Sequence, residues 1–370
     1  MSATGIEEKT FILNLGPQHP STHGVLRVLL EMDGEYVVRC EPDIGFGHRG
    51  HEHMAENRNY LQFLPNMGRV DYLHALAYNQ GYCMAVEKLL GLQVPERAEF
   101  IRVITAEMNR LTSHFLWVGA YLMDLGAFTP FLYCFDDREI LLDLLDRVTG
   151  SRLTYCFYRF GGVPQDIDEE FIAGTRAFIK RLRARWKDYH NLVTKNIIFI
   201  KRTKDVGIIS KDQCIKYGLT GPMVRGSGIP YDIRKSEPYS AYPRFDFEIP
   251  IGENGDIFDR YMVRMREMEQ SLRIMEQALD KLPDGPIMAE KVPKRIKPAV
   301  GEVYQAVETA RGEFGCYIVS RGDVKPYRIK LRVPSFGNLC ILPEVGRDTL
   351  VADLVAILGS MDVVVPEIDR

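Results

Sequence analysis

A long series of helical patterns restricts the fold of this chain more than any other feature. In residues 256–282, apolar side chains recur at alternating spacings of three and four, which places them on one face of a helix. Similar patterns occur in five earlier stretches, near 50–63, 70–91, 96–126, 130–148 and 167–195. Such helices bury their apolar faces against one another, so the sequence predicts a helical bundle over residues 46–285.

The last stretch gives the clearest pattern. Its apolar stripe is formed by Phe258, Tyr261, Met265, Met268, Leu272, Met275, Leu279 and Leu282. Asp256 stands just before the stripe, where its carboxylate can accept a hydrogen bond from a free backbone N–H group, so we expect it to be the N-cap. Core packing explains the methionines better than metal binding does, because flexible thioether side chains fill irregular gaps.

Strand-like patterns flank the predicted bundle. Residues 10–40 alternate between apolar and polar side chains and contain a turn signal at Asp33–Gly34, which predicts a small antiparallel sheet. Beyond the bundle, we expect strands at 303–307, 315–320 and 327–333 and a closing helix near 348–360. The predicted fold class is therefore α+β, mainly helical, with three regions: an N-terminal antiparallel sheet (1–45), the helical bundle (46–285) and an irregular α+β C-terminal cap (286–370).

Composition and charge exclude several classes of protein. With 46% hydrophobic and 26% charged residues and a net charge of −3, the chain has the profile of a folded globular protein. Its longest apolar run, Phe115–Met123, is about half as long as a membrane-spanning helix. The first residues, MSATGIEEKTF, lack the apolar core of a secretory signal, so we expect a location on the cytoplasmic side.

Seven cysteines are spread along the chain and never form a CxxC pair. This pattern favours reduced thiols. It also argues against a chain that holds its own iron–sulfur cluster or structural zinc ion. We expect this chain to hold no cofactor alone.

One stretch is strongly basic. Residues 176–204 contain ten Lys or Arg side chains and a single acidic one, Asp188. Such a cluster can contact phosphates, but no nucleic-acid recognition motif accompanies it. We interpret it as a solvated face or a dock for an acidic protein partner, and we expect no nucleic-acid partner.

Six of the eight histidines lie between residues 19 and 74, which raises the question of a metal site. The segment that begins at His51 resembles the start of the zinc motif HExxH, but Ala55 occupies the place of the second histidine. On a helix, His51 and His53 point about 200° apart and do not converge on one ion. We predict no metal site and interpret these histidines as surface or hydrogen-bonding residues.

The loop GPQHPSTHG (16–24) is one candidate for a reactive site. Two prolines and two glycines restrict its backbone, so His19 and His23 are held without a flexible tether. The alternative is a structural turn whose histidines bind backbone carbonyls.

A second candidate is GRVDYLH (68–74). We expect a helix to begin after Gly68, with the phenol of Tyr72 and the imidazole of His74 in its first turns. A phenol and an imidazole can donate two hydrogen bonds to a dicarbonyl ring that gains electrons and protons. The alternative for Tyr72 is a half-buried helix residue whose hydroxyl already has a partner.

Asp124 ends the apolar run of the third helical stretch. A carboxylate in that place should be partly buried, and it then needs a partner. A histidine is the natural partner, because an Asp–His pair fixes the imidazole tautomer and raises its basicity. The alternative is a carboxylate at the helix end that faces solvent near Gly126.

Together these segments resemble one family, the D subunit of proton-translocating NADH–quinone oxidoreductase (respiratory complex I). The resemblance rests on motifs along nearly the whole chain: GPQHPSTHGVLR (16–27), IGFGHRGHEHMAENRNY (44–60), GRVDYLHALAYN (68–79), the segment 85–131, RFGGV (159–163), LTGPMVRGSGIPYDIRK (219–235), FDRYMVRMREMEQS (258–271), ETARGEFGCYIVS (308–320), PYRIKLRVPSFGNL (326–339) and the terminal VPEIDR.

That family is itself similar to the large subunits of nickel–iron hydrogenases, which implies a hydrogenase-large-subunit-like fold. The hydrogenases hold their metals with two CxxC pairs. This chain has RVDYLH (69–74) and DVVVPE (362–367) in those places, and a soft nickel–iron centre is not held without thiolates.

The resemblance implies that the chain forms the head of a quinone channel. His23 and Tyr72 match the pair that hydrogen-bonds the two quinone carbonyls, and Asp124 matches the carboxylate that pairs with the loop histidine. Arg49 and Arg69 match arginines near the terminal iron–sulfur cluster, which a neighbouring subunit holds. The implied substrate is ubiquinone or menaquinone, which electrons from that cluster reduce.

The resemblance also implies a NADH–quinone oxidoreductase (translocase) subunit that is active only within the complex. Its partners would be other peripheral-arm and membrane subunits, and it would be a peripheral protein at the cytoplasmic side of the cell inner membrane. The alternative is a non-catalytic scaffold subunit of a hydrogenase-related energy-converting membrane complex.

One departure from the family concerns Thr154. Many relatives carry a histidine there that is linked to proton coupling at the cluster, and threonine does not titrate. We therefore expect a weaker pH dependence of the cluster's reduction potential.

Overall fold

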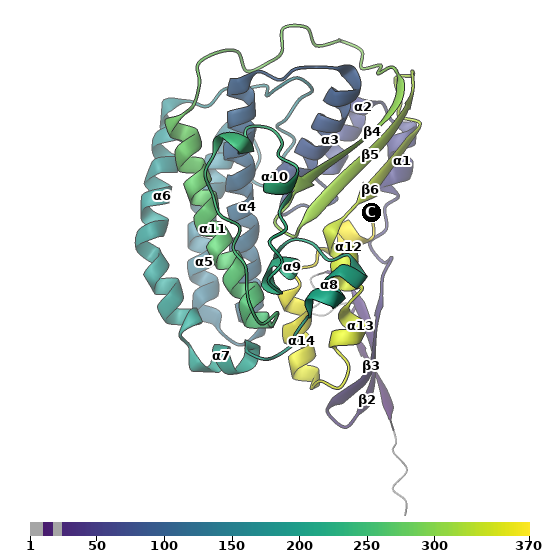
Figure 1. Ribbon diagram of the computed structural model, residues 1–370, viewed down its shortest axis with the longest axis vertical. Helices are drawn as coiled ribbons and strands as arrows, with labels where there is room; N and C mark the ends of the chain where they lie inside the picture. The colour runs from purple at the N-terminus through teal and green to yellow at the C-terminus, as the bar shows by residue number, and fades with distance from the viewer. Residues whose placement is uncertain (1–9, 18–23) are drawn as a thin grey trace, which may run out of the picture.

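Long helices and two small antiparallel sheets form the structure (Figure 1). It is a computed structural model, and it describes residues 10–17 and 24–370. The predicted fold class, mainly helical α+β, is confirmed. No helix in these residues is long and apolar enough to cross a membrane.

Four long helices run along one another in the bundle: α4 (Glu96–Asp124), α5 (Phe128–Thr149), α6 (Glu169–Tyr189) and α11 (Ile257–Asp280) (Figure 1). They match four predicted stretches closely. The exception is the end of α6, where a π-helical turn, η2 (His190–Thr194), replaces regular helix. Most side chains of α4 are buried, because other helices surround it on several sides.

The stripe predicted on α11 is confirmed as core. Its members from Tyr261 to Leu279 are buried, and Phe258 packs against the same core. The predicted N-cap is also confirmed, since the Asp256 carboxylate accepts a hydrogen bond from the Asp259 N–H at 2.8 Å. A local capping signal and a long apolar stripe together explain why this helix was predicted well.

The predicted N-terminal sheet is present, and the three strands predicted beyond the bundle form a second antiparallel sheet. The first contains β1 (Phe11–Leu15), β2 (Arg27–Asp33) and β3 (Tyr36–Asp43), with a two-residue turn at Gly34. The second contains β4 (Val300–Glu308), β5 (Glu313–Arg321) and β6 (Arg328–Arg332). Residues 309–312 form the tip of the tight hairpin between β4 and β5, which we call the hairpin tip.

The structure corrects the prediction for the first helical stretch, 50–63. It contains two helices, α1 (His51–Asn57) and α2 (Tyr60–Met67). Asn59 separates them because its backbone is extended and it caps α2: its side chain accepts from the Gln62 N–H, and the Gln62 side chain accepts from the Asn59 N–H.

Short helices escaped prediction. Five of them fill residues 196–255: α7 (Ile197–Thr203), α8 (Lys211–Tyr217), α9 (Pro222–Gly226), α10 (Ile233–Ser236) and the 3-10 turn η3 (Tyr242–Arg244). Near the C-terminus, α14 (Val351–Ser360) matches the predicted helix, and three more short helices accompany it: α12 (Pro334–Leu339), α13 (Leu342–Val345) and α15 (Val365–Ile368). Helices of one or two turns are too short to show a helical period in the sequence.

The burial of the α11 stripe predicts the effect of truncating it. Met268→Ala should lower the free energy of unfolding by about 2–5 kcal/mol, because it removes buried apolar atoms and leaves a cavity. Glu269→Ala, a change at the exposed neighbouring position, should alter it by less than about 0.5 kcal/mol. Chemical denaturation of the purified protein measures both, and equal losses would contradict the assigned core.

Candidate functional site

Tyr72 lies in a turn between α2 and the next helix, α3. This helix begins at Ala75 and ends at Leu90, so it starts several residues later than predicted. The cause is local. One oxygen of the Asp71 carboxylate accepts hydrogen bonds from the N–H groups of Leu73 (2.9 Å) and His74 (3.1 Å), which shapes the chain into a turn before α3 begins.

A buried arginine holds this turn from the other side. Arg311 lies at the hairpin tip, and its guanidinium donates to the second oxygen of Asp71 at 2.7 Å. It also donates to the hydroxyl of Ser113 on α4 at 3.1 Å and lies 3.6 Å from a carboxylate oxygen of Asp362. Arg311 is 1% exposed and Asp71 is fully buried, so separating the pair would leave an uncompensated charge in the core.

His74 has a structural role, contrary to the sequence-based hypothesis. Its Nε2 donates to the Ala106 carbonyl of α4 at 3.1 Å, and its Nδ1 accepts from the Ala310 N–H of the hairpin tip at 2.8 Å. Burial holds its pKa well below the ordinary value, and the nearby Arg110 cation lowers it further. A neutral imidazole with both nitrogens engaged has no hydrogen bond to give to a ligand.

The hydroxyl of Tyr72 is different. Tyr72 is half-buried, and none of the described residues forms a hydrogen bond with its hydroxyl. Burial raises its pKa, the Arg311 cation opposes the rise, and the carboxylates of Asp71 and Asp362 add to it. The hydroxyl therefore keeps its proton at neutral pH and can donate it in a hydrogen bond to a bound molecule.

Helix α4 runs from its contact with this turn to Asp124. One of its faces is marked by four side chains at four-residue spacing: Asn109, Ser113, Trp117 and Tyr121. Asn109 donates to the Leu73 carbonyl of the turn at 2.9 Å. Near the C-terminal end of α4, burial raises the pKa of Tyr121. Nearby arginines oppose this rise, and the Asp124 charge adds to it. The turn that carries Tyr72 thus contacts the middle of α4, the helix that ends at Asp124.

Asp124 is the last residue of α4 and is half-buried, as predicted. Its predicted partner, His23, and also His19 lie outside the described residues, so the Asp124–His23 pair stays a prediction. The chain re-enters the described part at Gly24, where an added Cβ would lie 3.8 Å from Val365. The end of the loop therefore lies beside the C-terminal segment.

Arg69 is an exposed residue in the turn after α2, beside the segment that carries Thr154. Burial raises the pKa of the Cys156 thiol, and the charges of Arg159 and Arg69 lower it. The backbones also lie close together, because a Cβ on Gly68 would come within 2.9 Å of the Tyr155 carbonyl oxygen. The structure thus brings Arg69 and the Thr154 segment together.

Arg49 is exposed just before α1, in the histidine-rich segment. The histidines there differ: His53 is exposed, whereas His51 is buried and burial, together with the charges of Arg49 and His48, lowers its pKa to about 4. In residues 10–17 and 24–370, no group of three or more His, Cys, Asp or Glu side chains is placed to hold a metal ion. All seven cysteines lie in the described part, and each is a free thiol.

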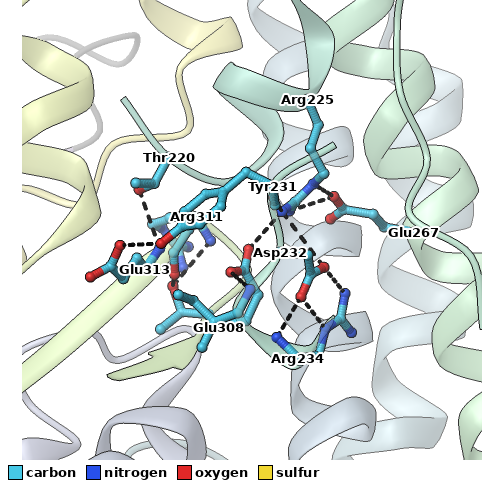
Figure 2. A network of polar contacts seen from close by, with 12 residues as sticks. Thr220, Arg225, Tyr231, Asp232, Arg234, Glu267, Glu308, Arg311 and Glu313 are labelled. Carbon is cyan, nitrogen blue, oxygen red and sulfur yellow. Dashed lines mark hydrogen bonds and ion pairs between the residues drawn. The ribbon is translucent and has the colours of Figure 1, made fainter. Parts of the chain in front are cut away.

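Beside the hairpin tip lies a network of buried ion pairs that the sequence did not predict (Figure 2). Its centre is Arg225 of α9, whose guanidinium lies close to three carboxylates, those of Glu267 (2.6 Å), Glu308 (2.8 Å) and Asp232 (3.6 Å). Arg234 of α10 continues the network from Asp232 (2.7 Å) to Glu107 (3.1 Å). The network joins α4, α11, β4 and the segment 220–236.

The charges in the network set one another's protonation. Burial raises the pKa of Glu267, but Arg225 and His114 lower it more, to about 2. Burial also raises the pKa of Glu308, the Asp232 charge adds to the rise, and Arg225 only partly offsets it. Glu267 is therefore a permanent anion at neutral pH, while Glu308 is protonated more easily.

Comparison with known proteins decides the family. The family model described as "Respiratory-chain NADH dehydrogenase, 49 Kd subunit" matches residues 124–299 and 291–370. The D subunit of NADH-quinone oxidoreductase from Syntrophobacter fumaroxidans is 63% identical over 365 residues, which cover 99% of this chain and 98% of that protein. The corresponding protein of Desulfotalea psychrophila is 60% identical over 363 residues, 98% of each chain. The chain belongs to this family.

The resemblance inferred from the motifs is thereby confirmed, and the chain is a subunit of an oxidoreductase complex, complex I. The family motifs also contain the buried network. The motif LTGPMVRGSGIPYDIRK carries Arg225, Asp232 and Arg234, and ETARGEFG carries Glu308 and Arg311. A sequence signal did exist, because charged residues on otherwise apolar helix faces need buried partners, and Glu107 and Glu267 stand on such faces.

The engaged state of His74 predicts a pH dependence of stability. An unfolded histidine titrates near pH 6.5, whereas folded His74 stays neutral. As the pH falls below about 6.5, the unfolded chain takes up a proton that the folded chain does not, so the free energy of unfolding falls by up to about 1.4 kcal/mol per pH unit. His74→Gln should remove this part of the decline between pH 6.5 and 5.5.

Chemical denaturation at several pH values measures the decline. His53→Gln is the matched control, because His53 is exposed and its replacement should leave the slope unchanged. A slope as steep in His74→Gln as in the unchanged protein would contradict the neutral state of His74.

Proposed function

We propose that this chain forms the inner wall of a quinone pocket, where a quinone is reduced to quinol. Two electrons would come from an iron–sulfur cluster held by a neighbouring subunit. The observation that carries the proposal is the Tyr72 hydroxyl: it is protonated, has no partner among the described residues, and stands in a turn held by the buried Asp71–Arg311 pair. The relatives are named as D subunits of NADH-quinone oxidoreductase, which supports a quinone as the substrate.

The chemistry requires donors that are already in place. Adding negative charge to a quinone in a cavity of low dielectric is costly unless hydrogen-bond donors stand ready at the ring oxygens. Tyr72 would donate to one carbonyl and His23 to the other. Asp124 would hold His23 and stabilise its cationic form, so that both residues supply protons as the ring gains electrons.

The proposal also assigns a place in the complex. Arg49 and Arg69 would face the partner's cluster, and the chain would be active only when that partner supplies electrons. Its partners would be other peripheral-arm and membrane subunits, with this chain as a peripheral protein at the cytoplasmic side of the cell inner membrane. The chain itself would hold no cofactor.

Tyr72→Phe tests the site, because it deletes one hydroxyl and keeps the ring. We expect electron transfer from donor to quinone to fall at least tenfold, since one preplaced donor is lost. Electron transfer from donor to ferricyanide, which does not require the quinone pocket, should stay unchanged. Both rates are measured in membranes that contain the assembled complex.

Tyr36→Phe serves as the control, because Tyr36 is an exposed tyrosine in β3. If quinone reduction persists in Tyr72→Phe, the phenol is a packing residue. The alternative, a scaffold subunit without contact to substrate, would then be favoured, and a quinone-site inhibitor should fail to bind at this subunit.

Thr154 allows a separate prediction about the partner's cluster. Redox titrations at several pH values should show a weak pH dependence of its reduction potential, because Thr154 does not titrate. Thr154→His should make the dependence steeper. The backbone accepts this change: Thr154 has φ 52°, a left-handed conformation that His adopts more readily than a β-branched residue.

Leu153→His places the same side chain on the exposed neighbouring residue and should leave the slope as it is. A strong dependence in the unchanged complex would contradict the role assigned to position 154.

A further inference from the structure

We propose that Arg311 is a positioning residue for quinone reduction, which fixes the Tyr72 hydroxyl by holding Asp71 and the turn around it. The inference rests on the proposed function of Tyr72 and adds a second residue to it. Arg311 itself does not reach the substrate in this account. It acts through the turn that presents the phenol.

Arg311 contacts Asp71 directly. The two oxygens of the Asp71 carboxylate have different partners. One accepts hydrogen bonds from the N–H groups of Leu73 and His74, and the other accepts a hydrogen bond from the Arg311 guanidinium. Asp71 is the residue before Tyr72, so its orientation fixes the backbone from which the phenol projects. Without the cation, the buried carboxylate would lose its compensating charge and the turn would rearrange.

The hairpin tip binds residues on both sides of Tyr72 in the sequence. Arg311 holds Asp71, and the N–H of Ala310, the preceding residue of the tip, donates to His74 at 2.8 Å. Adjacent residues of the tip therefore bind the residues on either side of the Tyr72–Leu73 pair. A shift of the tip would move both ends of this short turn together.

The hairpin tip is also held by its own hydrogen bonds and by close packing. The Thr309 side chain donates to the Gly312 carbonyl at 2.9 Å and accepts from the Arg311 N–H at 3.2 Å, which closes the tip on itself. Gly312 has φ 136°, and a Cβ there would come within 2.5 Å of the Thr220 hydroxyl. The tip thus packs directly against the segment that contains Thr220.

Strands β4 and β5, which flank the hairpin tip, are anchored to neighbouring segments. Glu308, the last residue of β4, binds Arg225, and Glu313, the first residue of β5, accepts from the Tyr231 hydroxyl at 3.0 Å (Figure 2). The Glu313 N–H donates to Thr220 at 3.2 Å. The buried network described above therefore fixes the hairpin from which Arg311 reaches the Tyr72 turn.

Electrostatics adds to this geometric role. Arg311 lies between Asp71 and Asp362, and it is the cation that opposes the rise of the Tyr72 pKa caused by burial and by these two carboxylates. A change at Arg311 therefore alters both the place of the phenol and its acidity.

A double-mutant cycle in the assembled complex tests the proposal. Arg311→Lys keeps the charge but loses the planar fork that binds Asp71 and Ser113 together. We expect quinone reduction to fall about tenfold and the apparent KM for quinone to rise, with ferricyanide reduction unchanged. If Arg311 acts through Tyr72, then Tyr72→Phe should cost less than about twofold more in the Arg311→Lys background, against at least tenfold in the unchanged complex.

The matched control is Arg102→Lys. Arg102 is equally buried and lies close to two carboxylates, those of Glu87 (2.7 Å) and Glu99 (3.7 Å), but it belongs neither to the buried network nor to the contacts of Asp71 and the Tyr72 turn. In its background, Tyr72→Phe should retain its full tenfold cost. If Arg311→Lys prevents assembly, Ser113→Ala replaces it in the cycle, because it removes one contact of the Arg311 guanidinium and leaves all charges in place.

The outcomes separate the two proposals. Additive losses in the cycle, with Tyr72→Phe harmful alone, would overturn the role of Arg311 and leave the quinone site intact. A Tyr72→Phe variant that reduces quinone normally would overturn the proposed function, and the inference about Arg311 with it. A loss of ferricyanide reduction in parallel with quinone reduction would show that Arg311 supports only folding, and would overturn its positioning role.

Discussion

The buried ion pair between Asp71 and Arg311 is the interaction on which the candidate site depends. It joins a turn near the beginning of the chain to a hairpin tip 240 residues later, inside a core that excludes water. Two charges in such surroundings are expensive to separate, so the pair tolerates little movement. The turn that carries Tyr72 is consequently held from within the core, although Tyr72 itself is only half-buried. Preorganised donors of this kind are what reduction of a buried quinone needs.

The remaining buried charges extend this constraint across the fold. Arg225, Arg234 and Arg311 each compensate at least two carboxylates, and these carboxylates come from α4, α11, β4 and the loops between them. A hydrophobic core tolerates repacking more readily than a set of paired charges, because any unpaired member pays its full desolvation cost. The network therefore fixes the relative positions of the bundle and the hairpin, and through them the site.

The sequence revealed what local patterns encode. The stripe and N-cap of α11, the extent of α4 and the strands of both sheets follow from periodicity and capping, and the structure confirms them. It did not reveal what depends on distant partners. The neutral, engaged state of His74 results from Ala106 and Ala310, which are distant in the sequence. The late start of α3 has a local cause, the hydrogen bonds that the Asp71 carboxylate accepts, but the periodicity of apolar residues does not show it. The pairing of Arg225 with its carboxylates was missed because most of these partners are distant in the sequence, and the short helices of residues 196–255 were missed because they are too short to show a helical period. The Tyr72 hydroxyl has no hydrogen-bond partner among the described residues, so its choice as a site residue stays a prediction, whereas both nitrogens of His74 are engaged by backbone groups.

The most direct test of the central claim is a structure of the assembled complex with a quinone or a quinone-site inhibitor bound. We predict that one oxygen of the head group lies within hydrogen-bond distance of the Tyr72 hydroxyl, about 2.6–3.2 Å, with the Asp71–Arg311 pair unchanged behind it. A head group bound elsewhere, with the Tyr72 hydroxyl out of reach of any of its oxygens, would contradict this claim.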